Sequence, residues 1–206
     1  MKAVKLDGKD CYPSKIVCIG RNYVDHITEL GNEIPKEPVI FLKPNSAIST
    51  DIHSCIDGDI HFEGELSFMV RSGELVAVGF GLDLTKRDMQ SRLKAKGLPW
   101  ERAKSFDGAA VFGEFVTFNG DITDLRLELH INEQLAQKGG YDLMMNKPES
   151  ILGEVKSFLS LEDGDLIMTG TPSGVGPVNI GDSFVGKVFE KDKLIAKAHW
   201  VVKEPR

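Results

Sequence analysis

The sequence lacks the features that define several large protein classes. Its apolar runs all fall short of the ~18 residues that a membrane-spanning helix needs, and its N-terminus has no apolar signal segment. Its three cysteines, Cys11, Cys18 and Cys55, are spaced for neither a disulfide framework nor a zinc knuckle. These absences predict a cytoplasmic protein in a reducing compartment, without a membrane partner.

Positive charge is also scarce. The chain has 25 Lys and Arg against 31 Asp and Glu, a formal net charge of −6. Binding to nucleic acid draws on excess positive charge, so no nucleic-acid partner is expected. The hydrophobic content of 41% with 27% charged residues is ordinary for a folded domain. At 206 residues the chain can bury its own core, and we expect one domain over residues 1–206.

Three common catalytic motifs are missing. The sequence contains no Gly-x-Gly-x-x-Gly, no Gly-x-x-x-x-Gly-Lys-Ser/Thr and no Gly-x-Ser-x-Gly. A dinucleotide-binding fingerprint, a phosphate-binding P-loop and the nucleophile elbow of serine hydrolases are therefore excluded.

Short β-like runs dominate the chain, and few helical segments separate them. We expect helices at 22–30, at 86–96, where Thr85 and Asp88 are placed like capping partners, and at 150–158. The expected strands are 15–19, 39–42, 60–70, 74–82, 110–118, 125–131, 166–168, 183–189 and 194–202. Without regular β-α alternation, this pattern predicts a strand-rich α+β fold rather than a doubly wound one.

The run His61-Phe-Glu-Gly-Glu-Leu-Ser-Phe-Met-Val70 is the most informative segment. Read as a strand, it places Glu63 and Glu65 on one face, where two carboxylates can converge on a cation. The alternative is a half-exposed strand with two solvated glutamates. Asp83, inside an apolar and glycine-spaced run, would complete an all-oxygen ligand set, unless it is a turn residue. Such ligands favour Mg²⁺, Mn²⁺ or Ca²⁺ over Zn²⁺.

Three further signals involve proton transfer or anion binding. His26 and Glu29 share a helix face, which suits a general base or an ordinary surface pair. Lys104, among apolar and aromatic neighbours, could stabilise developing negative charge or simply lie along the surface. The segment 169–176 offers hydroxyls and backbone amides as a carboxylate cradle, or is a loop rich in turn residues.

Taken together, these segments resemble the fumarylacetoacetate hydrolase family, in particular its small acylpyruvase-like and oxaloacetate-decarboxylase-like members. The matching pieces run in family order across nearly the whole chain: 18–26, 41–44, 63–65, 82–88, 103–106 and 169–172. The resemblance implies a mixed β-sheet roll, a homodimer, and a small 2-keto acid as substrate.

The resemblance also implies roles for individual residues. Glu63, Glu65 and Asp83 would hold Mg²⁺ or Mn²⁺, with Ca²⁺ possible in crystals. His26 with Glu29 would activate water, and Lys104 would support enolate charge. The substrate would be held by Arg21, Arg87, Gln90, Gly170 and Thr171. One departure is visible: residues 66–82 form a shorter segment than relatives usually carry there, so the rim on that side would differ.

These features predict cleavage of the C–C bond beside a 2-keto acid, by acylpyruvate hydrolysis, by oxaloacetate decarboxylation, or by both at one site. One alternative is isomerisation of an unsaturated 2-keto diacid. Another is a non-catalytic carboxylate-binding protein on the same fold, which the presence of a general base disfavours.

Register alone gives one structural expectation. A three-residue loop at 71–73 would pair Val70 with Glu74, so that odd positions face odd positions. Asp83 would then lie opposite His61, on the same face as Glu63 and Glu65. Gly81 and Gly79 would lie opposite the two glutamates and leave room for an ion. The other face would be a continuous apolar surface.

Overall fold

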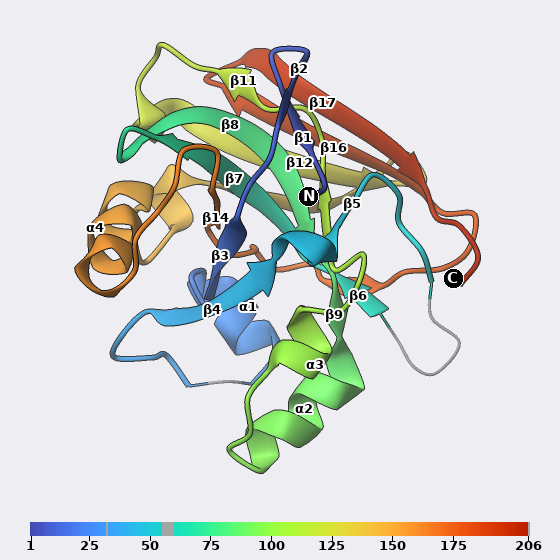
Figure 1. The fold of residues 1–206 in the computed structure, drawn as a ribbon. Coiled ribbons are helices and arrows are strands. Elements are labelled where there is room, and N and C mark those ends of the chain that lie inside the picture. The colour runs from blue at the N-terminus through green and yellow to red at the C-terminus, as the bar shows by residue number, and fades with distance from the viewer. Residues whose placement is uncertain (32, 55–59, 206) are drawn as a thin grey trace.

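A computed structural model describes residues 1–31, 33–54 and 60–205 of the chain. Its largest sheet has eight strands in the order β4-β3-β14-β7-β8-β10-β5, with β11 pairing to β8 (Figure 1). The strands of this sheet are β3 (Lys15–Gly20), β4 (Val39–Pro44), β5 (Ile48–Ser49), β7 (Gly64–Arg71), β8 (Glu74–Asp83), β10 (Ala110–Phe112), β11 (Val116–Thr117) and β14 (Leu166–Met168). Because β3 runs parallel to β14 and the other central pairs are antiparallel, the sheet is mixed.

Three smaller sheets accompany it. A four-stranded sheet has the order β13-β12-β16-β17. Its strands are β12 (Leu125–Ile131), β13 (Gln134–Gly140), β16 (Ser183–Glu190) and β17 (Lys193–Val201). The other two sheets comprise β15 (Gly176–Pro177), β6 (Ile60–Phe62) and β9 (Thr85–Lys86), and the hairpin of β1 (Val4–Leu6) with β2 (Lys9–Cys11). The expected strand-rich α+β fold is confirmed.

The main core lies between the eight-stranded and four-stranded sheets. Five even-numbered residues of β7 and β8 point into this layer: Leu66, Phe68, Val78, Phe80 and Leu82. Phe80 packs against Trp200 of β17 with ring centroids 6.2 Å apart. A Cβ on Gly186 of β16 would come within 2.3 Å of the Phe80 ring, so this approach of the sheets requires glycine. The second sheet therefore covers most of the predicted apolar face, but Val70 packs with α4 and Val76 packs against a separate cluster.

Helices cover other parts of the molecule. α4 (Pro148–Phe158) buries Ile151 and Val155 against β3 and β14, whereas α2 (Arg87–Ala95) and α3 (Glu101–Lys104) lie together beside β9 (Figure 1). The remaining helix, α1 (Val24–Glu29), follows β3. No helix in the described part of the chain is long and apolar enough to cross a membrane.

Several expected details are wrong. α2 begins at Arg87 with Lys86 as its N-cap and no side-chain capping bond, so Thr85 and Asp88 do not cap it. The run 110–118 is divided into β10 and β11, and α4 starts two residues before the expected position. The strands β1, β2, β5, β9, β13 and β15 and the short helix α3 were not predicted. Cys11 and Cys18 are free thiols, and Cys55 lies outside the described residues.

The hairpin between β7 and β8 closes with two loop residues, not three. Arg71 pairs with Glu74, and the loop is Ser72 and Gly73. Both have positive φ, at 52° and 75°, which is typical of the tight turns that match the twist of a hairpin. A two-residue loop by itself shifts the register by one and would turn Asp83 toward the apolar face.

A β-bulge restores the register. Met69 pairs with Ala77 but Val70 pairs with Leu75, so Val76 has no partner on β7. Beyond the bulge odd positions again face odd positions, and the Asp83 amide donates to the Glu63 carbonyl at 2.9 Å. The expected side of Asp83 is therefore confirmed, although the predicted pairs are wrong by two residues.

Gly81 and Gly79 make room for neighbouring side chains. Gly81 lies opposite Glu65, and a Cβ there would come within 2.4 Å of Ser67 Oγ and 2.9 Å of the Phe112 ring. Side chains therefore fill the space that glycine opens. Gly79 lies opposite Ser67, not opposite a glutamate.

Asp165 provides a test of the packing between β3 and β14. Its buried carboxylate accepts hydrogen bonds from the backbone and hydroxyl of Ser14, from the Glu162 amide, and from Lys15. Burial would raise the pKa of Asp165, but these donors outweigh it and lower the pKa. Because the folded pKa lies below the unfolded one, the stabilisation is present at neutral pH and disappears as pH falls through the folded value.

We therefore expect Asp165→Asn to reduce the free energy of unfolding at pH 7 by about 1.5–3 kcal/mol, the range for hydrogen bonds to a charged group. Urea denaturation at several pH values measures this, and the gap to wild type should close as the solution is acidified. Asp10→Asn, in an exposed pair with Lys5, is the control and should have a smaller effect. A gap that stays constant with pH would contradict the ionic role.

Candidate metal and catalytic site

Three carboxylates converge on the face of β7 and β8 that points away from the main core. Glu63 stands between β6 and β7, Glu65 lies on β7 and Asp83 ends β8. One oxygen from each lies within 4.8 Å of the other two, and all three residues are buried. The predicted cluster is therefore present in the fold, and the hypothesis of two solvated glutamates on a half-exposed strand is wrong.

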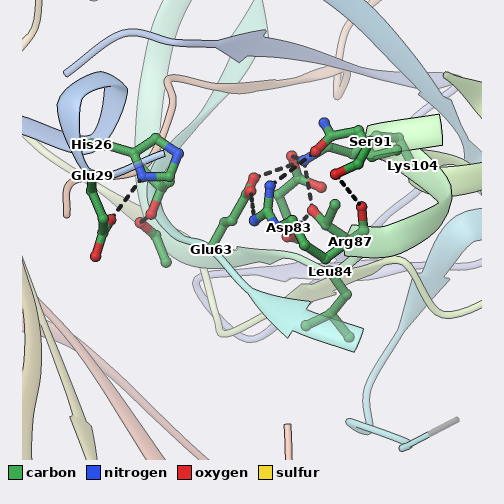
Figure 2. Close-up of polar contacts among 12 residues, drawn as sticks. His26, Glu29, Glu63, Asp83, Leu84, Arg87, Ser91 and Lys104 are labelled. Atoms are coloured by element: carbon green, nitrogen blue, oxygen red, sulfur yellow. Dashed lines mark hydrogen bonds and ion pairs between the residues drawn. The ribbon is translucent and has the colours of Figure 1, made fainter. Parts of the chain in front are cut away.

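Two buried lysines and an arginine surround this carboxylate cluster. Lys104 Nζ lies 2.7 Å from Glu63 Oε2, 2.7 Å from Asp83 Oδ2 and 2.7 Å from Thr85 Oγ1. Lys43 Nζ lies 2.8 Å from Asp83 Oδ1, although that oxygen has no partner in hydrogen-bond geometry. Arg87 pairs with Glu63 at 2.5 Å (Figure 2). Lys104 is 3% exposed, so it is not a surface lysine.

The positive charges of Lys104, Lys43 and Arg87 are not shared equally among the three carboxylates. Burial would raise the pKa of Glu63, but Lys104 and Arg87 outweigh it and hold the pKa well below its usual range. Burial, followed by the charges of Asp83 and Glu63, raises the pKa of Glu65 well above its usual range. Burial would lower the pKa of Lys104, but the charges of Asp83 and Glu63 outweigh burial and raise this pKa above its ordinary value. Glu65 is thus the member that most needs a further positive charge.

His26 and Glu29 form the second part of the site. His26 is 6% exposed, and its Nδ1 lies 3.2 Å from Glu29 Oε2. Figure 2 shows this pair on one side of Glu63, with Asp83, Arg87 and Lys104 on the other. A neutral imidazole that donates its Nδ1–H to Glu29 presents Nε2 as a proton acceptor. His26 is therefore not a solvated surface residue, whereas Glu29 is exposed.

The segment 169–176 holds the site's own carboxylates. The Gly170 amide donates to Glu65 Oε2 at 2.7 Å, and the Gly174 amide donates to Glu29 Oε1 at 3.0 Å. Both glycines have positive φ, at 93° and 97°. One loop therefore orients a candidate metal ligand and the residue that positions His26. The expectation of an open carboxylate cradle is wrong at these two amides.

A small cavity of about 40 Å³ connects the two parts of the site. Arg21 and Gln90 line it, and Arg87 Nη1 donates to Gln90 Oε1 at 2.9 Å. Thr171 is turned to the protein, because its hydroxyl donates to the Gly64 carbonyl at 2.9 Å. Contacts of Arg21, Arg87, Gln90, Gly170 and Thr171 with a substrate stay predictions.

Sequence reasoning missed two cationic residues. Lys43, fully buried beside Asp83, lies in the segment 41–44 that carried the family resemblance, but no role was assigned to it. Lys94 lines the cavity one helical turn after Gln90. Its spacing from Arg87 and Gln90 was the signal that could have identified it.

Comparisons with known proteins identify the family. A family model described as "Fumarylacetoacetate (FAA) hydrolase C-terminal" matches residues 15–202. The chain belongs to this family. An Escherichia coli relative, oxaloacetate tautomerase YcgM, is 36% identical, with 83% of this chain and 87% of the relative aligned. The mitochondrial oxaloacetate decarboxylase of Dictyostelium discoideum is 39% identical, with 81% and 85% aligned.

Solved structures share the fold. A candidate fumarylacetoacetate isomerase/hydrolase from Oleispira antarctica matches with a TM-score of 0.92 and 38% identity, covering 98% of this chain and 100% of its own. Fumarylpyruvate hydrolase from Pseudomonas aeruginosa, solved with Mn²⁺ and pyruvate, matches with a TM-score of 0.90 and 25% identity, covering 98% and 96%.

The residues present fit a hard divalent cation. All three candidate ligands are oxygen donors, which Mg²⁺ and Mn²⁺ prefer. Asp83 Oδ1 lacks a hydrogen bond, and Glu65 accepts one from a neutral amide while two carboxylates raise its pKa. A cation among these oxygens would give Asp83 Oδ1 a partner and would stabilise the charged form of Glu65.

We expect Mn²⁺ binding, measured by calorimetry, to strengthen as pH rises, because Glu65 must lose its proton to become a ligand. Glu65→Gln should weaken binding by about 10-fold to 100-fold and flatten this pH dependence. Glu154→Gln, an exposed change on α4, is the control and should bind like wild type. Equal affinity of Glu65→Gln and wild type would remove Glu65 from the ligand set.

Proposed function

We propose that the chain is a metal-dependent enzyme that acts on oxaloacetate and related 2-keto acids through an enolate. The observation that carries this proposal is the cluster of Glu63, Glu65 and Asp83 beside both a positioned histidine and a buried lysine. The relatives named as oxaloacetate decarboxylase and oxaloacetate tautomerase support the choice of substrate.

A divalent ion on the three carboxylates would polarise the keto oxygen of the substrate. Side chains of the protein would stabilise the enolate and bind the substrate carboxylate. Lys104 would place its ammonium near the oxygen on which enolate charge develops. Arg87 and Gln90 would hold the substrate carboxylate. Because Lys104 and Arg87 now bind Glu63, and the cavity measures about 40 Å³, both would have to release it for a four-carbon acid to enter.

His26 would be the general base. Glu29 accepts its Nδ1–H and in turn accepts the Gly174 amide, so the imidazole is held in one orientation. In acylpyruvate hydrolysis Nε2 would take a proton from water as the water attacks the distal carbonyl, and pyruvate would leave as its enolate. In decarboxylation of oxaloacetate the same enolate forms by loss of CO₂, without attacking water.

Tautomerisation of oxaloacetate is the second candidate, favoured by a base and a cation lining one cavity. His26 would move a proton between C3 and the enol oxygen, with Lys104 stabilising the charge between these steps. The isomerisation of unsaturated 2-keto diacids also needs such an enolate. A non-catalytic carboxylate-binding protein explains the site less well, because binding does not require an oriented general base.

The direct test is a substrate panel with and without EDTA. Oxaloacetate and acetylpyruvate should be turned over in the presence of Mg²⁺ or Mn²⁺, and the activity should disappear in EDTA-treated protein. Full turnover without metal would contradict the metal-dependent reaction, and no turnover of either compound with metal would contradict the enzymatic function.

We further expect His26→Ala to reduce acetylpyruvate hydrolysis by about 10²-fold to 10⁴-fold, the usual loss for a general base. Decarboxylation of oxaloacetate should fall much less, because it needs no activated water. Steady-state kinetics on both substrates measures this difference. His199→Ala, an exposed change on β17, is the control. An equal fall in both rates would instead give His26 a role in binding or folding.

We also propose that residues 1–206 form one catalytic domain, since the sheets that build the core also supply the site. The homodimeric assembly and the cytoplasmic location stay predictions.

A further inference from the structure

Cationic side chains outnumber carboxylates among the described residues that line the cavity. Among the described residues that line it, Arg21, Lys94 and Lys104 are cationic, and Glu63 is the carboxylate. Glu63 is already paired with Lys104 and with Arg87. In the proposed function Lys104 stabilises enolate charge, whereas Lys94 has no role.

Lys94 is placed to reach a bound molecule. In α2 the residues Arg87, Gln90 and Lys94 follow a spacing of three and four, so they share one face of the helix. Gln90 is buried, and Lys94 is half-buried at the end of this row. Burial, followed by the charges of Arg21 and Arg87, lowers the pKa of Lys94. A cation held beside two arginines gains from an anionic ligand.

Arg21 reaches the same cavity from a strained position. It directly follows β3 and has a φ of 56°, a left-handed conformation that non-glycine residues rarely adopt. Its neighbour Asn22 anchors this bend, because the side-chain Nδ2 of Asn22 donates to the Thr169 carbonyl at 2.8 Å and to the Asn146 carbonyl at 2.9 Å. Such strain persists where the surrounding structure enforces it, often at ligand sites.

We propose that Lys94, together with Arg21, binds the distal carboxylate of a 2-keto diacid, while the carboxylate cluster and Arg87 serve its keto acid end. This inference rests on the proposed function and narrows its substrate class to compounds with a negative charge at both ends. Lys94 is then a specificity-determining residue.

A second, mostly apolar groove adjoins the cavity. This groove of about 590 Å³ shares Phe41, Trp100 and Lys104 with the cavity, but neither Arg21 nor Lys94 lines it. Its other walls are mostly apolar, with Leu98 and Phe158 among them. A short diacid would keep its second carboxylate beside Lys94, whereas a neutral acyl chain would gain nothing from that charge.

The test compares Lys94→Met with Lys96→Met. Lys96 is exposed and follows the last turn of α2 on the opposite side, so the control removes the same charge near the same helix end. For Lys94→Met, kcat/KM with oxaloacetate should fall about 10-fold to 100-fold, mainly through KM, as for loss of a charged hydrogen bond. Acetylpyruvate, which is neutral at its distal end, should be turned over as by wild type. Lys94→Arg should retain most of the oxaloacetate activity.

Calorimetry provides a readout that does not depend on turnover. With Mn²⁺ present, wild type should bind 2-oxoglutarate, a stable 2-keto diacid, more tightly than pyruvate, and Lys94→Met should remove that preference while leaving pyruvate affinity unchanged. If wild type shows this preference but turns over no 2-keto acid, the proposed function fails and the diacid site stands. Equal losses of kcat/KM on oxaloacetate and acetylpyruvate in Lys94→Met would overturn the inference. An unchanged preference of this variant for 2-oxoglutarate over pyruvate would also overturn it.

Discussion

Burial of three carboxylates within 4.8 Å of one another is the constraint on which the rest of the site depends. Removing charges from water is costly unless each finds a partner, and removing one partner leaves an uncompensated charge. Lys104, Lys43 and Arg87 supply positive charge to Glu63 and Asp83, whereas Glu65 receives a backbone amide. This uneven compensation explains why the site suits a cation at Glu65, and why Lys104 must be buried rather than exposed.

The geometry of the cluster follows from two irregularities in otherwise regular structure. The bulge at Val76 corrects the register that the two-residue hairpin loop would impose, and so turns Asp83 toward Glu63. The loop after β14 places two glycines in left-handed conformations, and their amides orient Glu65 and Glu29. The metal side and the base side of the site are thereby connected through one segment, so a change in this loop would affect both.

Much of the fold could be predicted from the sequence, because alternating apolar residues report directly on buried strands. β12 and β14 have the expected bounds. The short strands β5 and β9 and the helix α3 were missed because tertiary pairing, not local pattern, stabilises such segments. The parity of the β7–β8 pairing was correct but its register was not, since no local signal marks the bulge. Contacts such as Lys43 with Asp83 join distant segments and cannot be read from spacing.

The central proposal for this site is that the carboxylate cluster binds a metal, and that Lys104 contacts Glu63 and Asp83 until the metal binds. The most direct test is a crystal structure of the protein soaked in Mn²⁺, with anomalous diffraction to locate the ion. We expect one anomalous peak coordinated by Glu63, Glu65 and Asp83, with the Lys104 ammonium moved away from the oxygens that it now contacts. A structure with Lys104 still bridging Glu63 and Asp83, and with no peak among the three carboxylates, would contradict it.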